Sequence, residues 1–231
     1  MKLVGIVGRA YYNLDEQKIM QVNEAVRKAL SGYDDICTIA LLPTEGVSYV
    51  DIPMGEDRIE LVDQKRLDFM LDKCDAFIIP GGTYWYRFDE YVINHACLYQ
   101  KPILAICAGF QAICSMDARE RTSFDMTKRL RDDTHYGPSD EYVHSVEVMD
   151  GTLLKNIVGN SYITVNSVHH DYIDFELNDW IVSARSEDGI VEAVELPEHV
   201  FALGIQWHPE YLMDEVSKKI FDSFVKSILE S

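Results

Sequence analysis

The chain has 231 residues and a formal net charge of −18, and hydrophobic residues make up 47% of it. This length and composition are typical of one globular domain, so we expect residues 1–231 to form a single domain. The acidic charge would be repelled by phosphate backbones and argues against nucleic-acid binding. No stretch approaches the ~20 apolar residues that a membrane span needs, so we expect no membrane partner.

The five cysteines show no CxxC pair and no regular spacing, which argues against a zinc cluster or a disulfide framework. The apolar run at residues 1–7 is too short for the core of a signal peptide. An odd number of cysteines without an export signal favours a reducing compartment, and we therefore expect a cytoplasmic protein.

Apolar runs alternate with helical periodicity along the first half of the chain. We expect strands at 2–7, 36–42, 75–80 and 102–106, and helices at 19–30, 59–73 and 88–100. In the second half we expect strands at 142–148, 162–165, 181–184, 190–194 and 201–206 and a last helix at about 214–229. We expect Cys37 to pack inside its strand. The alternation of strand and helix predicts an α/β fold with a parallel sheet.

The strand expected at 102–106 ends at Cys107 and is followed by Gly109 and a helical pattern. A strand, a sharp turn and a helix in that order hold a nucleophilic side chain out at the edge of a sheet. The N-terminal end of a helix also lowers the pKa of a thiol and makes it more reactive. A buried core cysteine is the alternative interpretation, and this stretch favours the nucleophile.

Two other segments are candidates for the wall of a site. Gly81 and Gly82 follow a buried strand, where α/β sheets place ligand-binding loops, and their N–H groups can approach a substrate closely. A plain tight turn explains the same glycines equally well. The charged segment 117–141 is by default a solvated face, and the functional alternative is a flap whose Arg129 and Arg131 bind a substrate carboxylate.

A thiol nucleophile needs a base, and the base needs a partner that fixes its tautomer. His208 and Glu210 lie one residue apart, just after the strand expected at 201–206. Alternate residues of an extended segment point the same way, so the Glu210 carboxylate can reach the imidazole of His208. Because the strand ends of a parallel sheet meet at one edge, we expect Cys107, His208 and Glu210 to form a catalytic triad.

Polar residues also gather at 166–170, after the strand expected at 162–165. The adjacent His169 and His170 suggest a metal, but no third ligand is clustered beside them in the sequence. Substrate contacts or structural hydrogen bonds are therefore favoured, and we expect no metal site.

Three short motifs occur in an order that resembles a known group of enzymes. Pro80-Gly-Gly82, Ile106-Cys-Ala-Gly-Phe-Gln111 and Gln206-Trp-His-Pro-Glu210 resemble the motifs of class I glutamine amidotransferase domains. Val165-Asn-Ser-Val-His-His170, Ser186-Glu-Asp-Gly-Ile-Val-Glu192 and Gly204-Ile-Gln-Trp-His-Pro-Glu210 further resemble the γ-glutamyl-γ-aminobutyrate hydrolase branch, peptidase C26. The resemblance covers nearly the whole chain.

The resemblance implies a flavodoxin-like sandwich, with a central mostly parallel sheet, helices on both faces and an additional small antiparallel sheet. It implies that Cys107 attacks a γ-glutamyl amide, that His208 transfers the proton and that Glu210 orients His208. The oxyanion hole would be formed by the backbone N–H groups of Gly82 and Ala108, and the substrate would be held by Gly81, Gln111, Ser167, Val168 and His169. Water would then release glutamate from a thioester, without a cofactor or a metal.

The chain departs from that branch at three places around the expected pocket. Ala108 replaces an arginine, Thr83-Tyr84-Trp85 replaces an acid-rich segment, and Asp171 stands where a glutamine is common. The triad motifs are intact, so cleavage of a γ-glutamyl bond remains the leading expectation, and the amine that is released stays open.

Three functions are compatible with these motifs. The leading one is a free-standing hydrolase that acts on a small γ-glutamyl compound. The first alternative is a glutaminase that delivers ammonia to a separate synthase subunit. The second is a non-catalytic regulatory relative, against which the intact triad argues. The partner of the leading function is a small-molecule substrate, and a homodimer is left open.

Overall fold

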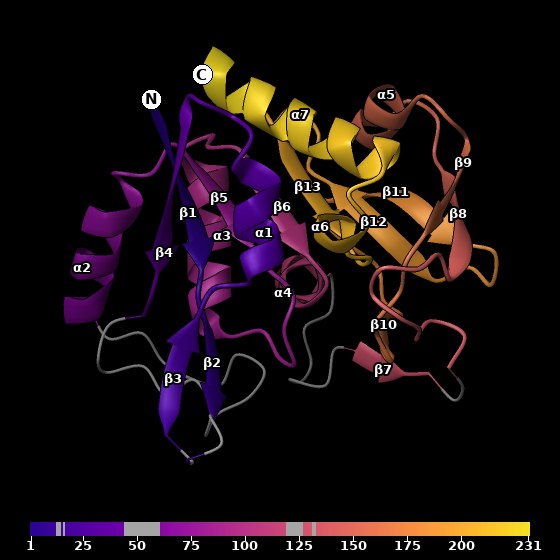
Figure 1. The fold of residues 1–231 in the computed structure, drawn as a ribbon, viewed down its shortest axis with the longest axis horizontal. Coiled ribbons are helices and arrows are strands. Elements are labelled where there is room, and N and C mark those ends of the chain that lie inside the picture. The colour runs from indigo at the N-terminus through magenta and orange to yellow at the C-terminus, as the bar shows by residue number, and fades with distance from the viewer. Residues whose placement is uncertain (13–14, 16, 44–60, 119–126, 131–132) are drawn as a thin grey trace.

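The structure, a computed structural model, describes residues 1–12, 15, 17–43, 61–118, 127–130 and 133–231 (Figure 1). Within these residues, nine strands form one sheet in the order β4-β1-β5-β6-β13-β12-β11-β8-β9. The first five strands in this order pair in parallel, and the remaining four continue the sheet with antiparallel pairs. No described helix is long and apolar enough to cross a membrane.

The parallel half of the sheet carries the buried apolar runs of the sequence. It consists of β4 (Ile36–Leu41), β1 (Lys2–Val7), β5 (Ala76–Ile79), β6 (Ile103–Ile106) and β13 (Ala202–Ile205). Every residue of β5, β6 and β13 is buried. Strands that are covered on both faces lose the alternation of polar and apolar residues, which is why these runs are continuously apolar.

Helices cover both faces of the sheet and create two hydrophobic cores. One core packs against α1 (Glu24–Leu30), α5 (Leu153–Val158) and α7 (Glu215–Glu230). The other packs against α2 (Leu61–Leu71), α3 (Arg87–Leu98) and α4 (Ala108–Asp117). The expected sandwich is confirmed.

The antiparallel half consists of β12 (Val191–Glu195), β11 (Ile181–Ser186), β8 (His144–Val148) and β9 (Tyr162–Val165). Two separate ribbons pair β2 (Arg9–Tyr12) with β3 (Lys18–Gln21), and β7 (Thr127–Arg129) with β10 (Asp171–Ile173). Both ribbons lie at the lower end of the molecule in Figure 1, toward which the carboxyl end of β1 points. They therefore flank the edge of the sheet at which α/β proteins bind their ligands.

Two predictions about strands and helices of the first half are wrong. The helix expected at 19–30 begins only at Glu24, because Asn23 caps it through the N–H of Ala25 and the preceding residues form β3. In β3 the β-branched Ile19 lies opposite Tyr11, a cross-strand pair that favours a sheet. Cys37 is exposed and does not pack inside its strand, because β4 is the edge strand of the sheet.

A close approach of backbone to backbone fixes the start of α4. A Cβ atom on Gly109 would lie 2.4 Å from the carbonyl oxygen of Ile79 in β5. Only glycine lets the first turn of α4 approach the neighbouring strand so closely. This contact sets the position of the residue between β6 and α4, which is Cys107.

Candidate active site

Cys107 is the single residue between β6 and α4, and its backbone has an unusual conformation. Its φ of 50° and ψ of −106° lie in a region that residues other than glycine rarely adopt. The Cys107 N–H donates to the carbonyl of Ile205 at 2.8 Å, and its own carbonyl accepts from the Gln111 N–H at 2.9 Å. The hydrogen bonds to Ile205 and Gln111 thus hold the strained turn in place. A strand, a turn and a helix in this order form the arrangement that presents a nucleophile.

His208 follows β13 and is fixed at its ring and at its backbone. The ring atom Nδ1 lies 2.8 Å from Oε1 of Glu210, and both side chains are almost fully buried. The His208 N–H donates to Oδ1 of Asn166 at 2.9 Å, and Nδ2 of Asn166 donates to the His208 carbonyl at 2.8 Å. Asn166 is therefore a positioning residue for His208; the sequence favoured substrate contacts or structural hydrogen bonds for this segment but did not indicate the partner.

The pairing of His208 with Glu210 was predicted from an extended segment, but the local structure is a helix. Pro209 and Glu210 open the short helix α6 (Pro209–Leu212), with His208 at its N-cap position. Proline fits the first turn of a helix because an N–H at that position would have no acceptor within the helix. The carboxylate thus reaches the imidazole from the first turn of a helix.

The electrostatic environment favours a charged His208 ring. Burial alone lowers the pKa of His208, but the Glu210 carboxylate and the adjacent Cys107 sulfur raise it well above its usual value. Since Nδ1 is bound to Glu210, only Nε2 remains to exchange a proton with the thiol. The arrangement is that of a nucleophile, a base and a carboxylate that orients the base.

Gly81 brings Cys107 and His208 together. A Cβ atom on Gly81 would lie 2.5 Å from Cε1 of His208 and 3.4 Å from Cβ of Cys107. The glycine loop is held in turn by the buried Arg9, which donates to the Pro80 carbonyl at 2.5 Å and pairs with Asp89 at 2.6 Å. Arg9 was not identified from the sequence, because its partners lie about seventy or more positions away in the chain.

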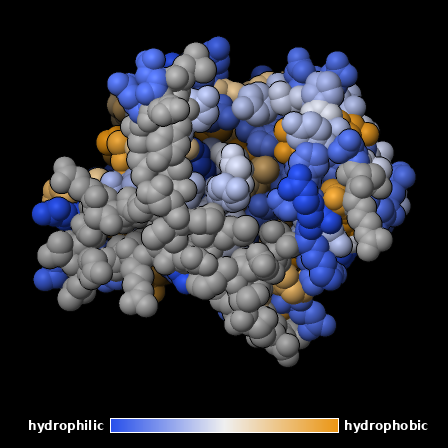
Figure 2. All heavy atoms as spheres, turned by 90° about the horizontal axis from the view of Figure 1, so that it is seen from below, coloured by the Kyte–Doolittle hydropathy of each residue, from blue (hydrophilic) through white to orange (hydrophobic). Residues whose placement is uncertain are grey.

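A cavity of about 770 Å³ opens beside Cys107. Figure 2 shows this end of the molecule, with a hollow whose described surroundings are mainly hydrophilic. The cavity is lined by Asn23, Gly81, Gly82, Thr83, Tyr84, Cys107, Gln111, Arg129, Tyr136, Ser139, Val168, His169, His170, Asp171, His208 and Tyr211. Segments from both halves of the chain therefore share one polar pocket around the thiol.

Most of the predicted site residues line this cavity, and three do not. Gly81, Gly82, Gln111, Val168 and His169 line it with Cys107 and His208. The part of the cavity formed by described residues does not include Ala108, Ser167 or Glu210. Ser167 is buried, and its hydroxyl donates to the carbonyl of His135 at 2.7 Å, so it holds a loop of the pocket wall.

Arg129 is the candidate from the charged segment 117–141 that the structure places at the pocket. It lies on β7, opposite Asp171 of β10. Arg119, Arg121 and Arg131 lie outside the described residues, so the idea of a flap rests on Arg129. Asn23, Tyr136, Ser139 and Tyr211 also line the pocket, although no local sequence pattern indicated them.

The sequence shows no third ligand beside His169 and His170, but the fold brings one of the two together with further candidate ligands. His169 lies with His135, His144 and Glu192, and one ligand atom from each lies within 4.8 Å of the others. His170 is not part of this cluster and stacks on Tyr136. The three partners of His169 come from distant positions, so spacing in the sequence gave no signal for them.

Two solved structures share the fold of this chain. The chain superposes over its whole length on the glutaminase domain of the CTP synthase of Trypanosoma brucei, with a TM-score of 0.68, 15% identity and 95% of that chain covered. A GMP synthase component from Thermoplasma acidophilum gives a TM-score of 0.67 with 19% identity and the same coverage of both chains. The fold is that of class I glutamine amidotransferase-like proteins.

Sequence comparison identifies the family within this class. Residues 87–210 match the model of the Peptidase C26 family. The chain is 31% identical to the γ-glutamyl-γ-aminobutyrate hydrolase PuuD of Escherichia coli over 193 aligned residues, which cover 71% of this chain and 76% of that protein. It is 40% identical over 220 residues to a glutamine amidotransferase-like protein of Rickettsia prowazekii, with 68% and 78% covered. The chain belongs to the Peptidase C26 family of glutamine amidotransferase-like hydrolases.

Proposed function

We propose that this protein is a cysteine-dependent hydrolase that cleaves the γ-glutamyl amide bond of a small γ-glutamyl compound. The observation that carries the proposal is the geometry of Cys107 and His208 at the wall of one polar cavity, with Glu210 bound to His208 behind that wall. The similarity to a γ-glutamyl-γ-aminobutyrate hydrolase supports the choice of the γ-glutamyl group.

In the first half of the reaction the Cys107 sulfur attacks the amide carbon, and His208 holds the thiol proton on Nε2. When the tetrahedral intermediate collapses, the C–N bond breaks and His208 donates this proton to the leaving amine. The products are a glutamyl thioester on Cys107 and a free amine. Glu210 is a positioning residue in this step, because its bond to Nδ1 keeps Nε2 directed at the reacting atoms.

In the second half a water molecule takes the place of the amine. His208 accepts a proton from the water as its oxygen attacks the thioester carbon, and the C–S bond then breaks. The sulfur leaves as the thiol after the proton returns to it, and glutamate is released. The cycle consumes one water and needs no oxidant or reductant.

Negative charge develops on the carbonyl oxygen in both halves, and backbone N–H groups are suited to stabilise it. Ala108 begins α4, and the first N–H groups of a helix have no acceptor within that helix. Gly82 precedes Cys107 in the chain and lines the same cavity. We assign the oxyanion hole to the N–H groups of Ala108 and Gly82.

Arg129 is suited to bind the α-carboxylate of the glutamyl group. It is the only lysine or arginine among the described lining residues of the cavity, in a chain whose net charge is −18. A guanidinium binds a carboxylate with two parallel hydrogen bonds, which fixes both position and orientation. Gln111, held by the side chain of Gln206 at 3.1 Å, supplies a neutral polar group on the same wall.

Glutamate release from a panel of γ-glutamyl amides and glutamine tests the proposal. We expect release by the wild type and by Cys37→Ala, whose substitution removes an exposed thiol far from the cavity, and none by Cys107→Ala. The preferred compound identifies the leaving amine. A preference for glutamine at a low rate would favour a glutaminase that works with a synthase. No release from any compound would favour a non-catalytic protein.

Alkylation of the thiols gives a test that needs no substrate. Burial raises the pKa of Cys74 and of Cys97 to about 11, and it raises the pKa of Cys114 well above its usual value, so these three thiols should react slowly near neutral pH. The exposed Cys37 competes with Cys107, so the experiment uses Cys37→Ala. If Cys107 is labelled no faster than Cys74, Cys97 and Cys114, Cys107 is not the nucleophile.

A further inference from the structure

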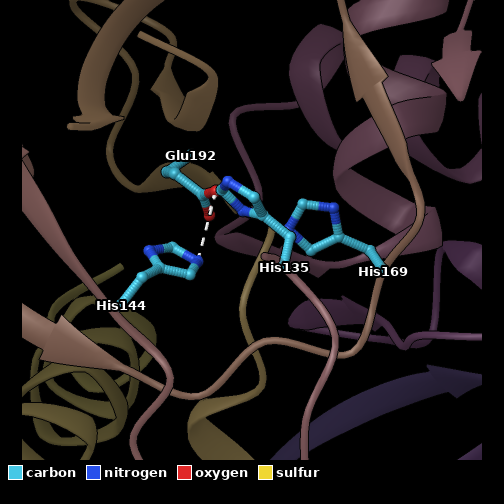
Figure 3. Close-up of side chains that lie close together, drawn as sticks. All are labelled: His135, His144, His169 and Glu192. Carbon is cyan, nitrogen blue, oxygen red and sulfur yellow. Dashed lines mark ion pairs between the residues drawn. The ribbon is translucent and has the colours of Figure 1, made fainter. Parts of the chain in front are cut away.

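Behind one wall of the cavity, three imidazoles and a carboxylate converge on one point (Figure 3). Glu192 comes from β12 and His144 from β8, two strands of the antiparallel half of the sheet. His169 and His135 come from loops, and the N–H of His169 donates to the carbonyl of His135 at 3.0 Å. Glu192 is fully buried, His135 and His169 are almost fully buried, and His144 is half-buried. The site is therefore mostly buried, and His169 belongs both to it and to the wall of the cavity.

The atoms that face each other in this cluster are not satisfied by the described residues. Oε1 of Glu192 lies 3.1 Å from Nδ1 of His135 and 3.6 Å from Nε2 of both His144 and His169. None of these nitrogens, and neither carboxylate oxygen, makes a hydrogen bond of acceptable geometry with a described residue. Unpaired buried polar atoms are costly, and five in one place indicate a missing partner at their centre.

The outer nitrogen of each ring has a partner that orients it. Nε2 of His135 lies 3.1 Å from Oδ2 of Asp188, Nδ1 of His144 lies 3.3 Å from the Ser145 carbonyl, and Nδ1 of His169 lies 3.0 Å from the Asp171 carbonyl. Histidines that bind metals almost always donate their second N–H to a carboxylate or a carbonyl, which directs the lone pair of the other nitrogen at the ion. All three rings have this arrangement, and each directs its other nitrogen toward Glu192.

We propose that His135, His144, His169 and Glu192 bind a divalent first-row transition-metal ion, with Zn²⁺ as the best fit. Three imidazole nitrogens and one carboxylate form a donor set that suits such ions and does not suit Mg²⁺ or Ca²⁺, which prefer oxygen ligands. Tetrahedral Zn²⁺ with bonds of about 2.0–2.1 Å separates its ligand atoms by about 3.3 Å. The distances of 3.1 and 3.6 Å from Oε1 to the three nitrogens bracket that value.

Charge supports the same conclusion. A buried carboxylate needs a positive partner, and no lysine or arginine of the described chain pairs with Glu192. A divalent cation would compensate Glu192 and leave the three rings neutral, as metal ligands must be. The alternative is a proton shared among three histidines and one carboxylate, and this alternative would bind no metal.

The ion would have a structural role, because four protein ligands leave a tetrahedral ion no open position for a substrate. It would join β8 and β12 to the two loops that carry Ser139, Val168 and His169 into the wall of the cavity. The loops are already in contact, since Tyr136 and Val168 form a β-bridge. Loss of the ion would loosen this wall and leave the reacting groups of Cys107, His208 and Glu210 in place.

Metal analysis and cobalt titration of the full chain test the proposal. We expect about one metal ion per chain after purification without chelators, and loss of this ion after dialysis against a chelator with a fall in melting temperature. Titration of the apoprotein with Co²⁺ alone should then produce the visible d–d absorption of a tetrahedral N/O site, saturating at about one equivalent.

Matched variants locate the ion. His144→Ala and Glu192→Gln should lose the cobalt absorption, whereas His170→Ala removes a neighbouring histidine outside the cluster and should keep it. Cys107→Ala should also keep it, because a signal that depended on Cys107, or that included thiolate charge-transfer bands, would place the ion in the active site.

The wild-type titration alone can overturn the proposal, even if a variant fails to fold. Absence of retained metal, together with no cobalt absorption and no change in melting temperature on adding Zn²⁺ or Co²⁺, would show that the cluster is a proton-sharing network. Equal metal binding by folded His144→Ala and the wild type would show that the ion binds elsewhere.

Discussion

The described part of the chain contains two histidine–glutamate centres, and they differ in how completely their hydrogen bonds are formed. At His208 the ring is bound to Glu210 at 2.8 Å, and its other nitrogen faces a thiol at an open cavity. At Glu192 three rings face one carboxylate without a hydrogen bond of acceptable geometry, and they are mostly buried. The first arrangement is suited to moving a proton and the second to holding a cation. The same residue types are thus suited to different chemistry because access and pairing differ.

The largest expected effect on kcat and on metal content comes from replacing Glu210 or Glu192 by glutamine. Glu210→Gln removes the charge that orients and stabilises the His208 imidazolium, and we expect kcat to fall by about 10³–10⁴-fold with metal content unchanged. Glu192→Gln should lose the metal and keep kcat within about tenfold of the wild type, because it lies outside the reacting groups. Steady-state kinetics and metal analysis of both variants measure the contrast. Loss of kcat in both alike would mean that the two centres act as one.

Gly81→Ala should reduce the rate without unfolding the protein. The new Cβ would lie 2.5 Å from Cε1 of His208, so the ring must move away from Cys107. A displacement of about 1 Å costs about 10²-fold in kcat. The matched control is Gly32→Ala, where a Cβ meets no atom within 4 Å, and its activity should equal that of the wild type. Circular dichroism and kcat measured together separate displacement from unfolding, and unchanged kcat in Gly81→Ala would contradict this account of the glycine.

A smaller effect is expected at the polar wall. If Arg129 binds the α-carboxylate, Arg129→Ala should raise KM by about tenfold and leave kcat unchanged, because the lost bonds act equally on substrate and transition state. Lys128→Ala is the matched control: Lys128 is exposed beside Arg129 on β7 and pairs with Asp174 outside the cavity. Equal KM values for the two variants would show that Arg129 does not bind the substrate.

The smallest effect is a pH dependence of stability. The folded protein binds the His208 proton more tightly than the unfolded chain does, because Glu210 and Cys107 outweigh burial and raise its pKa. This stabilisation is complete below the unfolded value of about 6.5 and is lost as the pH rises through the higher folded value. The difference in unfolding free energy between the wild type and His208→Gln should therefore be largest below about pH 6 and shrink as the pH rises through the folded pKa.

His199 provides a control of opposite sign. Burial lowers the pKa of His199, so its folded form binds a proton less tightly than the unfolded chain. The difference between the wild type and His199→Gln should rise as the pH increases through about 6.5 and then level off. Urea denaturation at a series of pH values gives both curves, and parallel curves would contradict the assigned pKa directions.

The sequence predicted that Cys107, His208 and Glu210 lie close together, because each of them has a local signal. Cys107 lies between a buried apolar strand and a glycine-containing helix start, and His208 and Glu210 are two residues apart after another such strand. Prediction from the sequence failed where the residues that pair with each other are far apart in the chain or where two periods fit equally well. The hairpin of β2 and β3 was missed because Ile19 and Met20 fit a helical period as well as a strand, and only pairing with Tyr11 and Ala10 decides between the two.

The sequence by itself determined the α/β alternation, the family motifs and the thiol, imidazole and carboxylate, because these depend on local periodicity and short spacings. Only the tertiary structure decided which wall each residue lines. It placed Arg9 under the glycine loop and Asn166 on the backbone of His208, and it turned Ser167 away from the pocket. It also gathered His135, His144 and Glu192 around His169. Strand order in the sheet brings these residues together, and strand order depends on packing over the whole chain.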